Sequence, residues 1–273
     1  MKILHRKLAN VLCCVVLLAV CDSQAESIIP KNVPELRPGI LAGYLSRKVL
    51  PDSLALLPAP PAPGSSAQAA DEEAFNATLV LRNTPRWVLA ADDAVLSFPK
   101  AADAFACAVD APVGPDTTPH LTILLRRSMV DAGLSTYGAK DHYKRTRPFV
   151  ANKAPSCSPA EEAALAKDGS YPSGHAALGW AWGLILAEMA PERANALIKR
   201  GYEFGQSRVV CGVHWQSDVN QGRVIGAAAV ARLHADPVFR AQFDEAAKEL
   251  ADARAKGLKP TGNCASDATA LKP

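Results

Sequence analysis

A continuous apolar stretch, HAALGWAWGLILAEMA at 175–190, restricts the possible folds of this chain more than any other feature. It is apolar all round a helix, which is typical of a helix buried inside a domain or of a membrane span. The stretch is shorter than the roughly 20 residues of a membrane span. It also begins at His175, contains Glu188 and stops at Pro191. We therefore expect a buried central helix.

Helical patterns extend over most of the remaining chain. No segment shows the sustained period-two alternation of a half-buried strand, and a hydrophobic content of 49% is enough for one core. The sequence therefore predicts an all-α, single-domain helical bundle over 69–256. We place its helices at 69–82, 86–106, 119–133, 135–144, 159–166, 175–189, 191–206, 215–235 and 237–256.

Two segments flank the predicted bundle. An N-terminal arm, 26–68, contains SLALLPAPPAPGSSAQ at 53–68, whose proline, glycine and serine content disfavours helix and predicts an extended stretch on the surface. The tail, 257–273, holds Gly, Pro, Asn and Ser, so we expect it to be mobile except where Cys264 is tied down.

The first 25 residues have the pattern of a signal peptide. Lys2, Arg6 and Lys7 precede an apolar run over 8–20, and small residues follow at 23–25. We predict cleavage after Ala25 and a periplasmic mature protein. The alternatives are a retained anchor, for which the apolar run is short, and a lipoprotein at Cys21, for which Val20 is too bulky.

Charge and cysteine content restrict the partners and the compartment. Cleavage removes three basic residues and one acidic residue, so a net charge of +3 falls to +1. This near-neutral balance argues against nucleic acid or an acidic membrane surface as a partner. The mature chain keeps Cys107, Cys157, Cys211 and Cys264. We expect two disulfides, with all three pairings open. A four-cysteine metal site is the alternative, but it lacks a Cys-x-x-Cys pair.

Three short segments stand out for their chemistry, and the most informative is SRVVCGVHWQSD at 207–218. On a helix, His214 and Asp218 would share one face, so Asp218 would fix the imidazole tautomer and leave the other nitrogen free to attack. Arg208 reaches the same point only if the chain bends, and Gly212 allows a bend. The alternative is an ion pair on the surface.

The second segment, YPSGH at 171–175, precedes the central helix. Ser173 is a good N-cap residue, and the free N–H groups of a first helical turn bind anions such as phosphate. His175 projects from that turn, where it could protonate a leaving group. The alternative is a histidine with structural hydrogen bonds only.

The third segment is KDHYKRTRP at 140–148. Lys140 and Arg147 are seven residues apart, nearly on one face of a helix that Pro148 would end. Two such cations suit a pair of phosphate oxygens. We expect the other basic side chains, His142, Lys144 and Arg145, to form a solvated face.

Taken together, the segments resemble a known three-part signature. Their order is similar to the signature of the phosphatidic acid phosphatase type 2 superfamily, which includes bacterial class A acid phosphatases and vanadium haloperoxidases. The three parts are Lys-x6-Arg-Pro, then Pro-Ser-Gly-His, then Ser-Arg-x5-His-x3-Asp. The class A group is the closer match, and the resemblance covers roughly 40–250. It is carried by the stretches 52–61, 134–149, 169–175 and 207–219. Ala176 departs from the Thr that is common after Gly-His.

This resemblance implies a reaction and a set of roles. His214 would be the nucleophile, Asp218 its orienting carboxylate and His175 the general acid. The phosphoryl oxygens would be held by Lys140, Arg147, Arg208, Ser173 and Gly174. The enzyme would hydrolyse small-molecule phosphomonoesters of broad specificity through a phosphohistidine, at acidic pH. The preferred ester, phosphotransferase or pyrophosphatase activity and the homo-oligomeric state stay open.

No cofactor is expected for this reaction. Three fixed cations and oriented amides can complement the charge on a transferring phosphoryl group. The sequence also has no cluster of Asp and Glu at metal-ligand spacing. The competing interpretations are a vanadium haloperoxidase, a membrane-embedded lipid phosphatase and a secreted binding protein with an inactive site. The intact signature argues against the last, and the absence of a second long apolar span argues against membrane insertion.

Overall fold

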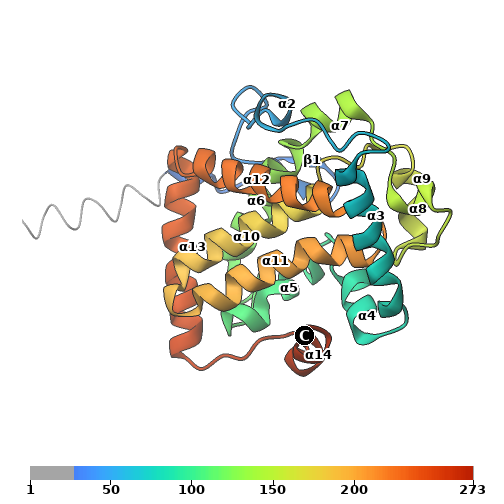
Figure 1. Ribbon diagram of the computed structural model, residues 1–273. Helices are drawn as coiled ribbons and strands as arrows, with labels where there is room; N and C mark the ends of the chain where they lie inside the picture. Colours follow the sequence, from blue (N-terminus) through green and yellow to red (C-terminus); the bar gives the residue numbers. More distant parts are fainter. Residues whose placement is uncertain (1–27, 273) are drawn as a thin grey trace, which may run out of the picture.

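The predicted central helix is α10, Gly174–Met189, and it is buried along most of its length. It packs against α11 (Ala194–Val210), α12 (Gln216–Leu233) and α6 (Pro119–Leu134). Figure 1 shows α10 between α11 and α12, with α13 (Pro237–Ala255) crossing the ends of these helices. The computed structural model describes residues 28–272, so the predicted signal peptide lies outside the described residues.

Close packing around α10 depends on small residues. A Cβ on Gly183 would lie 3.2 Å from the Cα of Gly201 on α11, so the two helices can approach this closely only without side chains there. Trp182 is fully buried, and its indole N–H donates to the carbonyl of Leu125 of α6 at 3.1 Å. Helix α10 is therefore a fixed base for the residues at its N-terminus.

The described chain is mostly helical, which confirms the predicted fold class, but several elements differ from the prediction. Helix 86–106 is two helices, α4 (Pro85–Asp92) and α5 (Lys100–Val109). The break contains Pro99, and Asp93 within it turns inward to pair with Arg200 of α11. Four more helices are α3 (Ser66–Thr78), α7 (Tyr137–Tyr143), α8 (Pro148–Ala151) and α9 (Glu162–Leu165), with 3-10 turns at Leu79–Leu81, Pro159–Glu161 and Pro191–Arg193.

The N-terminal arm contains regular structure that was not predicted. Strands β1 (Glu35–Arg37) and β2 (Ile40–Leu41) form a small antiparallel hairpin. The proline-rich stretch includes one helical turn, α2 (Ser53–Leu56), which Asp52 caps. Asp131 of α6 holds the arm by accepting from the N–H groups of Tyr44 at 2.8 Å and Leu45 at 3.0 Å.

Two disulfides form, as predicted, and the structure gives their pairing. Cys107 is bonded to Cys264, and Cys157 to Cys211. The first ties the C-terminal segment to α5. A further helix, α14 (Cys264–Ala270), lies in this tail and packs against α4. Among the described residues, no helix has both the length and the apolarity to cross a membrane.

Candidate active site

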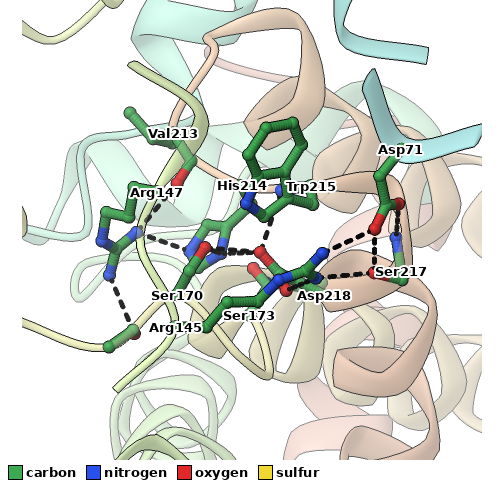
Figure 2. Close-up of polar contacts among 12 residues, drawn as sticks. Asp71, Arg145, Arg147, Ser170, Ser173, Val213, His214, Trp215, Ser217 and Asp218 are labelled. Atoms are coloured by element: carbon green, nitrogen blue, oxygen red, sulfur yellow. Dashed lines mark hydrogen bonds and ion pairs between the residues drawn. The ribbon is translucent and has the colours of Figure 1, made fainter. Parts of the chain in front are cut away.

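The three predicted segments meet at one cavity of about 590 Å³. Lys140 and Arg147 come from the first segment, Gly174 and His175 from the second, and Arg208 and His214 from the third. All six line the same cavity, and apolar residues of α6 and the β1–β2 hairpin form other parts of its wall. Figure 2 shows Arg147, Ser170, His214 and Asp218 converging from separate stretches of chain.

A turn between α11 and α12 brings Arg208 and His214 together. Gly212 has a φ of +76°, a conformation that glycine adopts without strain, and the predicted bend there is confirmed. After the turn, the N–H groups of Val213 and His214 both donate to the carbonyl of Arg208 at 3.2 Å. Helix α12 begins only at Gln216. The prediction that His214 and Asp218 share a helix is therefore wrong, because His214 lies in the turn.

His214 is buried, with 3% of its side chain exposed, which excludes the surface ion pair. Its Nε2 lies 3.0 Å from Nη1 of Arg147. A guanidinium can only donate, so Nε2 accepts and the imidazole proton is on Nδ1. This Nδ1 lies 3.4 Å from Oδ2 of Asp218 and 3.4 Å from Oγ of Ser170. The tautomer leaves a lone pair on Nε2.

Electrostatics keep this imidazole neutral. Burial lowers the pKa of His214 well below its usual value, and the positive charges of Arg147, Lys140 and Arg208 lower that pKa further. Protonation would place another positive charge among three cations without bulk water to screen it. These effects favour the neutral imidazole, whose Nε2 lone pair accepts from Arg147.

Lys140 and Arg147 reach the cavity by a different route from the one predicted. Helix α7 ends at Tyr143, and Lys144 follows with a φ of +45°. Arg147 is the N-cap residue of α8, so Pro148 starts a helix instead of ending one. Both cations nevertheless contact Oδ2 of Asp168, Lys140 at 3.3 Å and Arg147 at 2.9 Å. Burial lowers the pKa of Lys140 to about 8.

Arg208 is a buried cation without a hydrogen-bond partner. Its side chain is 0% exposed, and none of its three guanidinium nitrogens donates to any group within residues 28–272. The nearest carboxylate, Glu161, lies 4.0 Å away. Burial lowers the pKa of Arg208 to about 10, so it stays charged. An isolated buried charge is costly, and an anion in the cavity would provide the missing acceptor.

The first turn of α10 forms another part of the cavity. Ser173 is the predicted N-cap, and its Oγ accepts from the N–H of Ala176 at 3.2 Å. Its own N–H donates to the carbonyl of Asp218 at 3.0 Å. The expectation that this amide holds phosphate is therefore wrong, because it is already bonded. A Cβ on Gly174 would meet only Thr136 Oγ1, at 3.8 Å, so the space beside Gly174 is open to a ligand.

His175 lines the cavity beside Arg208. Its Nε2 lies 3.1 Å from the carbonyl of Ala94, which can only accept, so Nε2 carries a proton. Burial and the charge of Arg208 lower the pKa of His175 well below its usual value. Its Nδ1 therefore carries a proton only in acid or beside a bound anion.

Two polar residues at the site were missed or misjudged from the sequence. Ser170 donates to Oδ2 of Asp218 at 2.5 Å and lies beside His214. Arg145 was expected on a solvated face, but its side chain is only 9% exposed and it forms ion pairs with Asp71 and Asp218. His142 and Lys144 are exposed, as predicted. Nothing local separates Arg145 from these two, since its partners lie far along the chain.

Within residues 28–272, no group of three or more His, Cys, Asp or Glu side chains is placed to hold a metal ion. The charged residues that line the cavity are Arg37, Lys140, Arg147, Arg208 and Asp168, and the carboxylate of Asp168 pairs with Lys140 and Arg147.

Comparisons with known proteins agree with the geometry. The PAP2 superfamily model matches residues 121–241. The non-specific acid phosphatase of Providencia stuartii is 42% identical over 85% of this chain and 93% of its own length. The non-specific acid phosphatase of Salmonella typhimurium is 44% identical over 72% of this chain and 79% of its own length. An acid phosphatase of Zymomonas mobilis is 40% identical over 77% and 79% of the two chains.

Proposed function

Since this chain belongs to the PAP2 superfamily and to its bacterial non-specific acid phosphatases, we propose that it is an acid phosphatase that transfers the phosphoryl group of a phosphomonoester to Nε2 of His214. The observation that carries the proposal is Arg208, a buried guanidinium without an acceptor. It lines one cavity with two further cations and a neutral imidazole. A phosphate dianion would pair with these cations and give Arg208 its missing acceptor, whereas an uncharged substrate would leave that guanidinium without one.

The first half-reaction forms a phosphohistidine. The substrate phosphate accepts from Arg147, which releases the lone pair on Nε2 of His214. This lone pair forms the N–P bond as the P–O bond to the alcohol breaks. The departing oxygen takes a proton from Nδ1 of His175. His214 then carries a positive charge, with its Nδ1–H facing Asp218, and that carboxylate stabilises it.

The second half-reaction returns the enzyme to its starting state. A water molecule attacks phosphorus, gives a proton to the now neutral His175, and forms a new P–O bond as the N–P bond breaks. Lys140, Arg147 and Arg208 hold the three phosphoryl oxygens throughout, where charge accumulates in the transition state. An alcohol in place of water would give phosphotransfer, and a phosphate leaving group would give pyrophosphatase activity.

The direct test is a pH series with an aryl phosphate, run with and without EDTA. We expect hydrolysis that EDTA does not reduce and that is fastest in acid. The pKa of His175 is lowered, so its acid form grows as the pH falls. The pKa of Lys140 is lowered to about 8, so kcat/KM also falls as the pH rises through that value and this cation is lost. Activity confined to alkaline pH and abolished by EDTA would refute the proposal.

Replacing His175 by alanine tests the proton donor. Alkyl phosphates have poor leaving groups, so we expect kcat for them to fall by about 10²- to 10³-fold. Aryl phosphates, whose leaving groups need less protonation, should lose less than about tenfold. Both rates are measured on one preparation, so the aryl ester controls for damage to the rest of the site. Equal losses on the two esters would remove the general-acid role from His175.

We also propose that the enzyme acts in the periplasm. The predicted signal peptide would direct it there, and the two disulfides are typical of an oxidising compartment. N-terminal sequencing of the mature protein should begin at Glu26.

A further inference from the structure

The guanidinium of Arg145 lies between the carboxylates of Asp218 and Asp71 (Figure 2). Its Nη1 donates to Oδ1 of Asp218 at 2.6 Å and to Oγ of Ser217 at 2.7 Å. Its Nη2 donates to Oδ2 of Asp71 at 2.8 Å and to Oε1 of Gln68 at 2.6 Å. One guanidinium therefore bridges α3 and the first turn of α12.

Asp71 holds the same turn of α12 from the other side. Its Oδ1 accepts from the N–H of Ser217 at 2.8 Å, and its Oδ2 accepts from Oγ of Ser217 at 2.5 Å. The side chains of Asp71 and Asp218 are 4% and 0% exposed. Hydrogen bonds to ionised groups in such a buried setting are strong and directional. The Asp71–Arg145–Asp218 bridge, formed by these three residues, therefore fixes the carboxylate that faces His214.

We propose that Arg145 is a positioning residue for the reaction, acting through Asp218 and anchored by Asp71. The inference rests on the proposed function, since it assigns a role in that reaction. Asp218 uses Oδ1 for Arg145 and Oδ2 for Ser170 and the N–H of Trp215. With both oxygens occupied, the carboxylate has one orientation, in which Oδ2 faces Nδ1 of His214.

Arg145 also limits how strongly Asp218 attracts a proton to His214. The charged groups around this pair are Arg145 and Asp71 on one side and Arg147, Lys140 and Arg208 on the other. Asp168 pairs with Arg147 and Lys140, and the titratable imidazole of His175 lines the same cavity. Without Arg145, two buried carboxylates lose their shared counter-ion, and the negative charge near the imidazole rises. Protonated His214 would become more stable, and protonation at Nε2 removes the attacking lone pair.

The experiment compares Arg145→Gln with Arg145→Lys. For Arg145→Gln we expect kcat to fall about 10²-fold with KM changed less than about threefold, because the phosphate-binding cations stay in place. The pKa of His214, followed by NMR of its imidazole nitrogens, should rise by about one pH unit. In a plot of kcat/KM against pH, the fall on the acidic side should shift to higher pH by a similar amount. Arg145→Lys keeps the positive charge but not the paired N–H donors of the guanidinium. The pKa of His214 should therefore match the wild type, while kcat should recover only in part.

Arg193→Gln is the matched control. Arg193 is a half-buried arginine that joins two segments by donating to the carbonyls of Ala108 and Cys107, and it does not line the cavity. This variant should keep wild-type kcat and pH dependence. Asp71→Asn is a milder variant of the bridge. It should lose about tenfold in kcat, since Arg145 would keep its bonds to Asp218 and Gln68 but lose its ion pair with Asp71.

The outcomes separate the possible roles. Wild-type kcat and an unshifted acidic limb in folded Arg145→Gln would overturn the inference. A loss of kcat without a change in the pKa of His214, and not relieved by lysine, would show structural support alone and would also overturn it. If Arg145→Gln does not fold, wild-type kcat in Asp71→Asn would be decisive against the inference. The NMR titration needs no turnover, so an inactive wild type would refute only the proposed function.

Discussion

Replacing His214 by alanine should abolish turnover while the protein folds as before. The N–P bond of the intermediate forms on Nε2, and His175 does not replace it, because its Nε2 donates to the carbonyl of Ala94 and its Nδ1 is the proton donor of the proposed reaction. We expect kcat for an aryl phosphate to fall by at least about 10⁴-fold. The backbone N–H of His214, which donates to the carbonyl of Arg208, is unchanged by the substitution. Circular dichroism and thermal melting should therefore match the wild type closely.

The intermediate itself provides a second measurement. Wild-type enzyme quenched during turnover of a ³²P-labelled ester should carry base-stable, acid-labile phosphate, and the His214→Ala variant should carry none. His142→Ala is the control, since His142 is exposed and does not line the cavity. Near-normal activity in the His214 variant would place the nucleophile on another residue.

The features that were predictable from the sequence are those with a local cause. The side chains of the apolar stretch around Trp182 are removed from water only in the interior of the protein. The burial of this stretch in α10 therefore followed from composition alone. Ser173 at the start of that helix and Gly212 at a chain reversal acted as predicted because capping and positive φ depend on neighbouring backbone. The convergence of the three segments followed from their resemblance to a family signature.

The features that were missed depend on tertiary contacts. Arg145 and Lys144 are adjacent basic residues, and the ion pairs that Arg145 forms with Asp71 and Asp218, both far along the chain, bury one and leave the other exposed. The break between α4 and α5 has a similar cause, because Asp93 turns inward to meet Arg200. Pairings between residues so far apart leave no periodic signal in a single sequence.

Arg208→Met should nearly abolish activity and at the same time stabilise the ligand-free protein. The side chain of Arg208 is 0% exposed and its guanidinium donates to no group among the described residues. The folded state therefore bears the desolvation of a charge that no hydrogen bond compensates and whose nearest carboxylate, Glu161, is 4.0 Å away. An apolar side chain of similar length removes that cost. We expect kcat/KM to fall about 10³-fold and the free energy of unfolding to rise by about 1–3 kcal/mol. Activity assays and thermal melting measure both.

Arg200→Met gives a control on the same helix with the opposite expected sign. Arg200 is also buried, but it pairs with Asp93 and donates to the carbonyl of Ala104 at 2.7 Å. Its removal leaves Asp93 buried without its counter-ion, which should destabilise the protein by about 3–5 kcal/mol. Comparing the two variants therefore distinguishes Arg200, a cation that stabilises the folded protein, from Arg208, a cation that binds the ligand.

Inorganic phosphate completes the test of Arg208. A ligand that binds only the folded protein raises its stability as its concentration exceeds Kd. Phosphate should therefore raise the melting temperature of the wild type and of Arg200→Met, but not that of Arg208→Met. If Arg208→Met were as unstable as Arg200→Met and still responded to phosphate, Arg208 would be a structural residue. The anion would then be held by Lys140 and Arg147 alone.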